Sequence, residues 1–243
     1  MEIKSDIIVS QSLNREMSVE VYGHYGISIL VFPAITGEST EWKKSGFIDS
    51  IEHLIRIGKC KLFCISGVDN DMWLNNSIEP KEKSLLHFNF NKFVEDECVQ
   101  YIYEQCGGAV PIITAGAANG AFHAANTFFR RPDLFFGTIA ISGKYDLSDL
   151  TGDYFDENCY FNSPMHYLPN LNDSYWLSFL YSRRHIYLAS GAGCNESPES
   201  SQNLADVLKE KGIRHHIEIW GSEYDHDYTT WVEMFKHFVE TRL

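Results

Sequence analysis

A tight turn bounded by glycines follows an apolar run in the middle of the chain and has the sequence Gly116-Ala-Ala-Asn-Gly120. In a G-x-S-x-G turn between a strand and a helix, the central serine projects from the sheet edge as a nucleophile, and the flanking glycines allow close backbone approach. The central position here is Ala118, so the segment predicts such a turn without its hydroxyl. A plain small-residue turn is the competing interpretation, since short glycine motifs are weak signals.

A histidine near the C-terminus is placed to act as a general base. His226 is the only histidine between the expected last strand and the expected last helix. Where the chain order is nucleophile, acid, base, this loop carries the base. Glu196 is the only carboxylate in the loop 190–197 and could orient the imidazole of His226. An acid that favours a helix N-terminus is the alternative role for Glu196.

Two backbone segments could stabilise an oxyanion. Asn119 opens the helix after the turn, so its N–H would face the site. The loop 32–37 (FPAITG) follows an early strand and could supply a second N–H, from Ala34 or Ile35. Read in isolation, that loop is an ordinary Pro/Gly turn.

Further candidates lie close to these positions. His123, Tyr228 and Trp231 are candidate substrate contacts, although His123 more readily packs or hydrogen-bonds within its helix. A metal site at 225–227 (Asp-His-Asp) is disfavoured, because adjacent loop residues rarely converge on one ion. We expect neither a metal nor an organic cofactor.

Alternating strand-like and helix-like segments predict one α/β domain over residues 1–243, with a mostly parallel twisted sheet and helices on both faces. The first two strands should form an antiparallel pair around Gly23–Gly26. The segment 145–182 is irregular and is either a cap over the site or a surface excursion. The expected strands are 16–22, 27–32, 60–65, 109–115, 137–142, 185–190 and 214–219, and the expected helices are 39–57, 91–105, 119–130, 199–211 and 228–241.

Composition excludes several classes of partner. A net charge of −13 disfavours nucleic acid and anionic membrane surfaces. No run approaches the roughly 20 apolar residues of a membrane span. The N-terminus lacks the apolar core of a signal peptide, and the six cysteines show no CxxC pair, so we expect a cytoplasmic protein with reduced thiols.

Taken together, these segments resemble the esterase-D-like and antigen-85-like branch of the α/β hydrolases, and above all its uncharacterised bacterial esterases. The resemblance spans about residues 15 to 241 and implies an α/β-hydrolase fold, a serine–acid–histidine triad and a small ester or acylated substrate. It does not indicate the acyl group, the alcohol or the oligomeric state. The segments that carry it are VFPAITG (31–37), GAANGAFHAANTFFRRPDLF (116–135), IAISGKYDLSD (139–149), SGAGCNE (190–196) and EIWGSEYDHDYTTW (218–231).

The chain departs from the family pattern at the nucleophile. Alanine at position 118 cannot form an acyl-enzyme, so this chain should be nearly inert. A designed serine-to-alanine replacement and a natural non-catalytic binding protein are the two explanations. Intact surroundings favour the first, because triad members work as a unit. An acyltransferase on the same scaffold is a further alternative.

Overall fold

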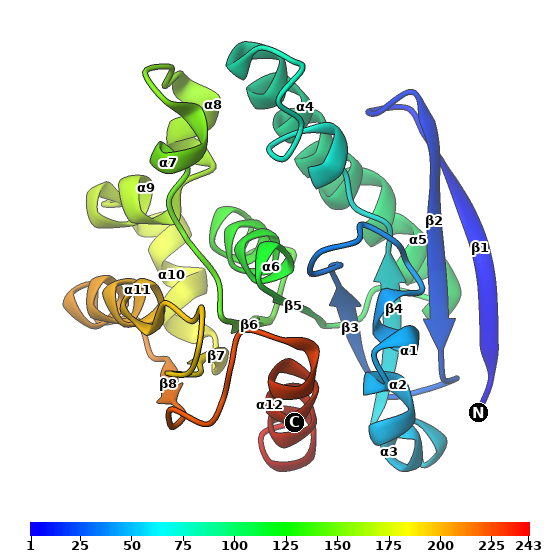
Figure 1. Cartoon of the computed structure of the whole chain (residues 1–243). Coiled ribbons are helices and arrows are strands. Elements are labelled where there is room, and N and C mark those ends of the chain that lie inside the picture. Colours follow the sequence, from blue (N-terminus) through cyan, green and yellow to red (C-terminus); the bar gives the residue numbers. More distant parts are fainter.

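Eight strands form one sheet through the middle of the computed structural model, which describes residues 1–243 (Figure 1). The strand order is β1-β2-β4-β3-β5-β6-β7-β8. Strands β1 and β2 pair antiparallel, β2 also pairs antiparallel with β4, and β3 to β8 run parallel. The bounds are β1 Ile3–Ser10, β2 Arg15–Tyr22, β3 Ile27–Val31, β4 Cys60–Ile65, β5 Ile112–Ala117, β6 Gly137–Ile141, β7 His185–Ser190 and β8 His216–Ile219.

Helices connect the parallel strands, as crossover connections require. The bounds are α1 Glu41–Lys44, α2 Phe47–Ser50, α3 Glu52–Arg56, η1 Asp69–Asp71, α4 Pro80–Lys92, η2 Phe93–Cys98, α5 Val99–Cys106, α6 Asn119–Arg130, α7 Ser148–Thr151, α8 Glu157–Phe161, α9 Pro164–Asn170, α10 Ser174–Ser182, α11 Pro198–Glu210 and α12 Tyr228–Thr241. None of these helices combines the length and the apolar character needed to cross a bilayer.

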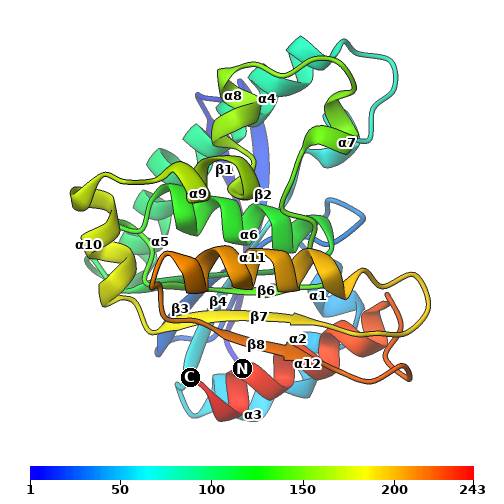
Figure 2. The same ribbon diagram turned by 90° about the vertical axis from the view of Figure 1, so that its left-hand side faces the viewer.

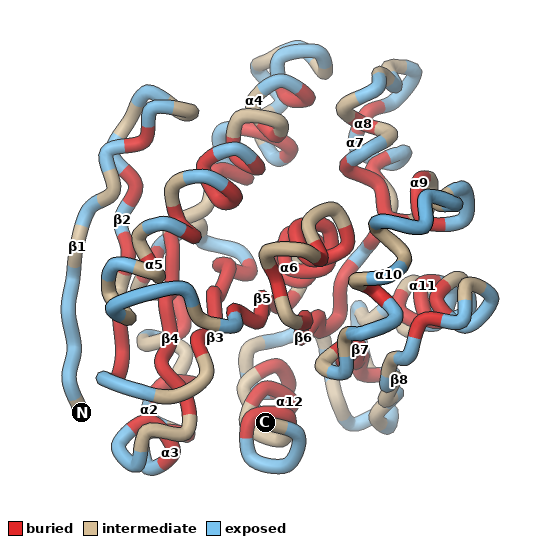
Figure 3. The backbone as a smooth tube through the Cα atoms, turned by 180° about the vertical axis from the view of Figure 1, so that it is seen from behind, coloured by how far each residue is buried: buried red, intermediate tan, exposed pale blue.

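The sheet is covered on both faces, as the alternating pattern predicted. Helices α6 and α11 lie on one face, whereas α1 to α3 and α12 lie on the other (Figure 2). Every residue of β4, β5 and β6 is buried, and one apolar cluster fills each face. Burial is therefore concentrated around β5 and α6, while β1 is largely exposed (Figure 3).

The expected antiparallel pair around Gly23–Gly26 is wrong. Strand β2 pairs with β1 and β4, and the chain then crosses over so that β3 lies between β4 and β5. Strand β1 was not expected, because it lies at the exposed sheet edge and mixes polar with apolar residues. The glycines carry the crossover: a Cβ on Gly26 would stand 2.5 Å from the carbonyl carbon of Lys59.

Two expected helices have different bounds. The helix expected over 39–57 is broken into α1, α2 and α3, with Gly46 in a left-handed conformation at the first break. The helix expected over 91–105 begins at Pro80 instead and continues through the π-helical turn η2 to Cys106. Polar residues dominate α4, so its sequence shows little of the apolar periodicity on which the expectation relied.

The segment 145–182 folds into four short helices, α7 to α10. They continue the chain from the carboxyl end of β6, and α8 lies alongside α4, outside α6 on the same face of the sheet (Figures 1 and 2). A cap over the site therefore remains a prediction for this segment.

The fold makes a sharp prediction at Gly116. A Cβ built there would lie 2.1 Å from the carbonyl oxygen of Gly120, so strand β5 and helix α6 would have to separate. We expect Gly116→Ala to lower the free energy of unfolding by about 3 kcal/mol or more, because overpacking against backbone cannot relax. Urea unfolding followed by circular dichroism measures this.

Gly212→Ala is the matched control. Gly212 also ends a helix tightly, with a φ of 69°, but no atom lies within 4 Å of a Cβ there. Only the left-handed strain of about 1–2 kcal/mol should appear. Equal losses for the two variants would contradict the close approach of β5 and α6.

Candidate active site

The turn at Ala118 has the geometry predicted for a nucleophile position. It joins β5 to α6 with φ 49° and ψ −118°, a conformation that costs a non-glycine residue about 1–3 kcal/mol. Its N–H donates to the carbonyl of Ile141 at 2.9 Å, and its carbonyl accepts from Ala121 in the first turn of α6. The Ala118 side chain lines a cavity at the carboxyl ends of the strands.

His226 lines the same cavity, and Glu196 lies behind it. Nδ1 of His226 is 3.3 Å from Oε2 of Glu196, close enough for an ion pair but not aligned for a hydrogen bond. Acid–base pairs are often loosely aligned without substrate and tighten when it binds. The structure thus brings together Ala118, His226 and Glu196, the three positions that the sequence singled out.

The carboxylate of Glu196 is fully buried and held by two hydroxyl groups. Ser142 donates to Oε1 at 2.6 Å, and Ser190 donates to Oε2 at 3.0 Å. Burial alone would raise the pKa of Glu196, but His226 and the two serines outweigh it and hold the pKa below the usual glutamate value. Glu196 is therefore ionised at neutral pH, as an acid that orients a histidine must be.

Glycines let the two loops that carry this pair lie against each other. A Cβ on Gly191 would stand 2.1 Å from the carbonyl oxygen of Tyr224, and one on Gly193 would stand 2.3 Å from Oδ1 of Asp225. The backbone N–H of His226 donates to the carbonyl of Cys194 at 3.0 Å. The position of His226 is thus fixed by backbone contacts with the loop that holds Glu196.

The N–H groups expected to supply a second oxyanion donor are already bonded within the chain. The N–H groups of Ala34 and Ile35 both donate to Oε1 of Glu41, at 2.7 and 3.0 Å, and neither residue lines the cavity. Thr36 donates to the other oxygen of Glu41 through its N–H and its hydroxyl. The loop does form an anion-binding nest, but a carboxylate of the same chain, from the start of α1, fills it.

Asn119 remains the predicted oxyanion donor of the site. It is the first residue of α6 and lines the cavity beside Ala118. The first N–H groups of a helix have no partner within the helix and carry its positive dipole end. Of the predicted donors, only Asn119 therefore lines the cavity beside the nucleophile position.

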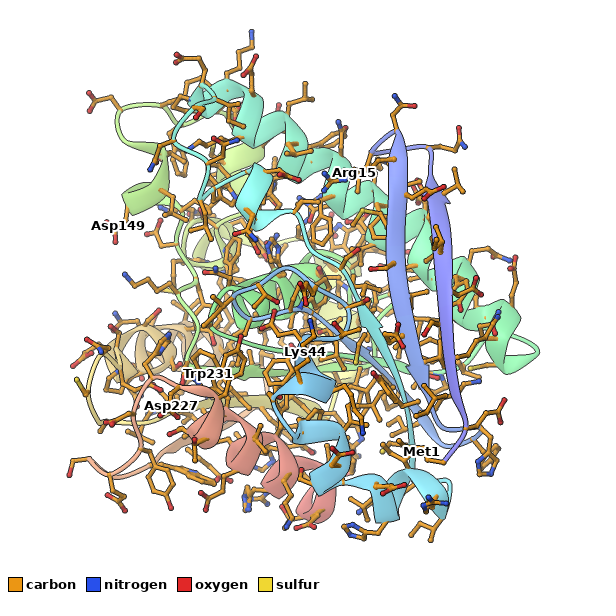
Figure 4. The ribbon with its side chains drawn as sticks, turned by 45° about the vertical axis from the view of Figure 1, so that its right-hand side comes forward. Met1, Arg15, Lys44, Asp149, Asp227 and Trp231 are labelled. Carbon is orange, nitrogen blue, oxygen red and sulfur yellow. The ribbon has the colours of Figure 1, made fainter.

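The expected substrate contacts lie behind the cavity wall instead of on it. Trp231 is fully buried at the start of α12, near Asp227, and meets the His226 ring edge-on at 4.9 Å (Figure 4). Tyr228 donates its hydroxyl to Glu41 at 2.9 Å, and His123 is buried against Asp69. Trp231 and His123 thus support His226 and Asp69, which line the cavity, whereas Tyr228 supports Glu41, which does not.

The cavity has a volume of about 330 Å³ and includes residues that the sequence analysis did not single out. Asp69 and Trp73 follow β4, whereas Ser142 and Lys144 follow β6. Ligands of open α/β sheets bind outside the carboxyl ends of the strands, so the residues after each expected strand were the available signal. The remaining lining residues are Leu74, Phe122, Gly143, Asp146, Leu147, Asp149, Leu150, Asn195 and Ser197.

The two aspartates beside His226 have structural partners. Asp225 accepts from the N–H of Cys194 at 2.6 Å, and Asp227 caps α12 by accepting from the N–H of Thr230 at 3.0 Å. No group of three or more potential ligands gathers to hold a metal ion. The residues 225–227 thus serve loop and helix geometry.

Comparison with known structures identifies the fold. A ferulic acid esterase superposes with a TM-score of 0.77 at 16% identity, covering 98% of this chain and 97% of the other. Mycobacterium tuberculosis MPT51 gives 0.68 at 15% identity over 99% and 97% of the two chains. An S-formylglutathione hydrolase from Agrobacterium tumefaciens gives 0.71 at 12% identity over 98% and 92%.

This chain has the α/β-hydrolase fold. No protein-family model and no curated protein matches its sequence. The strand order and the placement of Ala118, Glu196 and His226 agree with the order of elements that this fold uses for nucleophile, acid and base.

Glu196 generates a prediction about pH. A folded-state pKa below the unfolded value gives stability that is present at neutral pH and lost as the pH falls through the folded pKa. Glu196→Gln should lower the free energy of unfolding at pH 7 by about 1–3 kcal/mol. The loss relative to the parent should shrink as the pH falls below the ordinary pKa of glutamate, because the parent carboxylate then begins to protonate as well.

Urea unfolding of both proteins between pH 7 and pH 3.5 measures this difference. Glu210→Gln, at the exposed end of α11, is the control and should change stability little at any pH. A Glu196→Gln penalty that stays constant with pH would contradict the ionised, buried carboxylate.

Glu41 generates a second prediction. Both oxygens of Glu41 accept hydrogen bonds, and in Glu41→Gln an amide NH₂ would replace one of them and face donors instead. The variant should therefore lose about 2–4 kcal/mol of unfolding free energy. Thermal and urea unfolding would show the loss, and Glu38→Gln on the neighbouring exposed surface should barely change it. A silent Glu41→Gln substitution would mean that the nest does not depend on the carboxylate.

Proposed function

We propose that this chain is the alanine form of a serine-type carboxylic ester hydrolase, which binds an ester in the cavity but cannot cleave it. One observation carries the proposal: the strained turn at Ala118 opens into the same cavity as His226, which Glu196 supports from behind. The esterase and the hydrolase that share the fold support ester chemistry, although at 12–16% identity they show only the architecture.

The mechanism of a serine form follows from these positions. A serine Oγ at residue 118 would attack the ester carbonyl carbon while Nε2 of His226 takes its proton. The negative charge on the carbonyl oxygen would be stabilised by the N–H of Asn119 at the start of α6. Collapse of this intermediate breaks the bond to the alcohol, which leaves with the proton from His226.

The acyl-enzyme is then hydrolysed by the same groups. His226 takes a proton from water, the hydroxide attacks the acyl carbon, and the carboxylic acid leaves as the proton returns to the serine. Glu196 holds the imidazole orientation and stabilises its charged form throughout. An acyltransferase would use the same residues with an alcohol in place of water, and remains an alternative for the serine form.

Two features set the expected rates. Loss of the hydroxyl removes covalent catalysis, which costs on the order of 10⁶-fold in kcat. Engagement of Ala34 and Ile35 by Glu41 leaves one backbone donor for the oxyanion, and one missing donor costs about 10²–10³-fold. The serine form should therefore be active but slower than a hydrolase with two free donors.

The same occupied nest favours a second candidate, a natural non-catalytic protein that binds a ligand or partner through the old pocket. Such a protein has no use for free oxyanion donors, and the Glu41 carboxylate saturates them internally. The codon for residue 118 in the source genome separates the candidates: a serine codon indicates a designed replacement, and an alanine codon indicates natural loss.

Ala118→Ser is the decisive variant. It should hydrolyse short p-nitrophenyl esters and react with a fluorophosphonate probe, because the base and the acid are in place. We expect a rise in kcat/KM of about 10³-fold or more over the parent, measured by p-nitrophenol release. Labelling of the intact protein, followed by mass spectrometry, should place the probe on residue 118.

The double variant Ala118→Ser/His226→Ala is the matched control and should lose both reactions. A folded Ala118→Ser protein that neither hydrolyses esters nor reacts with the probe would overturn the esterase proposal. It would leave the binding protein as the function of this cavity.

A further inference from the structure

The cavity wall on the far side of Ala118 from His226 is built from residues that the proposed mechanism does not use. Asp69 and Trp73 reach the cavity from the segment after β4, and Phe122 reaches it from α6. Strands β4 and β8 lie on opposite sides of β5 in the sheet. We call Asp69, Trp73 and Phe122 the β4-side wall.

The carboxylate of Asp69 is held in place by a buried histidine. Asp69 is 7% exposed, and Nε2 of His123 lies 2.9 and 3.1 Å from its two oxygens. His123 is one helical turn beyond Asn119, so the helix that carries the oxyanion donor also fixes Asp69. A buried carboxylate with a single protein side chain as its partner retains lone pairs that can accept from a ligand.

The aromatic walls are held by a second buried histidine. The indole N–H of Trp73 donates to Nδ1 of His87 at 3.2 Å. Burial, reinforced by the nearby His123 and Arg130, holds the pKa of His87 well below its usual range, so its ring is neutral and accepts this bond. The centroid of the Phe122 ring lies 5.5 Å from the ring centroid of His87 and 5.2 Å from that of His123.

Each group of the wall is thus fixed before a ligand arrives. Preorganised side chains with supporting residues behind them mark a binding surface, because ordering them at the moment of binding would cost affinity. The other charged residues make the cavity more acidic. Asp146 and Asp149 also line it, and Lys144 is the one lysine or arginine that does.

We propose that the β4-side wall binds a positively charged amine, quaternary or protonated, carried by the ester. A carboxylate beside two aromatic rings is the combination that attracts such a group, through charge and through the ring faces. The acidic cavity, in a chain of net charge −13, disfavours carboxylate and phosphate esters. This inference rests on the proposed function, since it assigns the substrate class of the same cavity.

The direct test measures binding to the parent chain, which cannot consume the ester. Isothermal titration calorimetry compares acetylcholine with 3,3-dimethylbutyl acetate, its uncharged carbon isostere. We expect acetylcholine to bind at least tenfold more tightly. Equal affinities, or binding of neither ester, would overturn the inference, as would tighter binding of an anionic ester such as monobutyl succinate.

Two variants locate the preference. Asp69→Asn keeps an acceptor for His123 but removes the charge, and should lower the preference for acetylcholine by about tenfold. Asp153→Asn removes an exposed carboxylate that does not line the cavity, and should change it less than twofold. Equal effects of the two substitutions would show that net charge, and not the wall, governs binding.

Phe122→Leu removes one ring without changing any charge and serves if Asp69→Asn fails to fold. It should weaken acetylcholine binding several-fold while leaving the neutral isostere unchanged. An equal loss for both esters would overturn the role of the wall.

Hydrolysis separates this inference from the proposed function. Ala118→Ser should cleave the neutral ester whether or not the wall selects a cation. Cleavage of both acetate esters with equal kcat/KM would therefore remove the substrate class and leave the esterase standing. If Ala118→Ser cleaves neither ester while the parent binds acetylcholine selectively, the esterase proposal falls and the cation-binding wall stands.

Discussion

The contact between Gly116 and Gly120 determines most of what the site can be. Gly116 lets strand β5 meet helix α6 without a side chain between them, and Gly120 lets α6 approach the backbone of Phe32 and Pro33 in the same way. The bend at Ala118 brings residue 118 and Asn119, the first residue of α6, to the same cavity. The nucleophile position and the predicted oxyanion donor thus depend on two close backbone approaches, each of which requires a residue without a Cβ atom.

The sequence predicts the parts of this arrangement that are local or fixed by chain order. The turn at Ala118 follows from glycine spacing, and Glu196 and His226 follow from their loops after late strands, so the structure brings all three together. The strand expected before the turn begins three residues later than predicted, as β5, while α6 and α12 have the expected bounds. Boundaries of this kind are the least reliable element of a prediction from one sequence.

The remainder depends on contacts between segments that no local pattern encodes. Glu41 folds back on its own loop and takes the N–H groups of Ala34 and Ile35, a contact invisible in a Pro/Gly turn. Asp69 lies in a stretch without periodicity, and its partner His123 comes from 54 residues away. The order of β3 and β4 in the sheet is likewise a long-range choice that alternation of strands and helices leaves open.

The backbone at Ala118 also bears on the history of the chain. Its strained φ and ψ serve to display a reactive side chain, and a methyl group draws no benefit from them. A glycine would adopt the same angles at little cost, so a lineage long freed from catalysis would gain stability by drifting to glycine there. A strained alanine at this position is therefore what the proposed exchange of one side chain would leave behind, within a framework shaped for the residue it replaced.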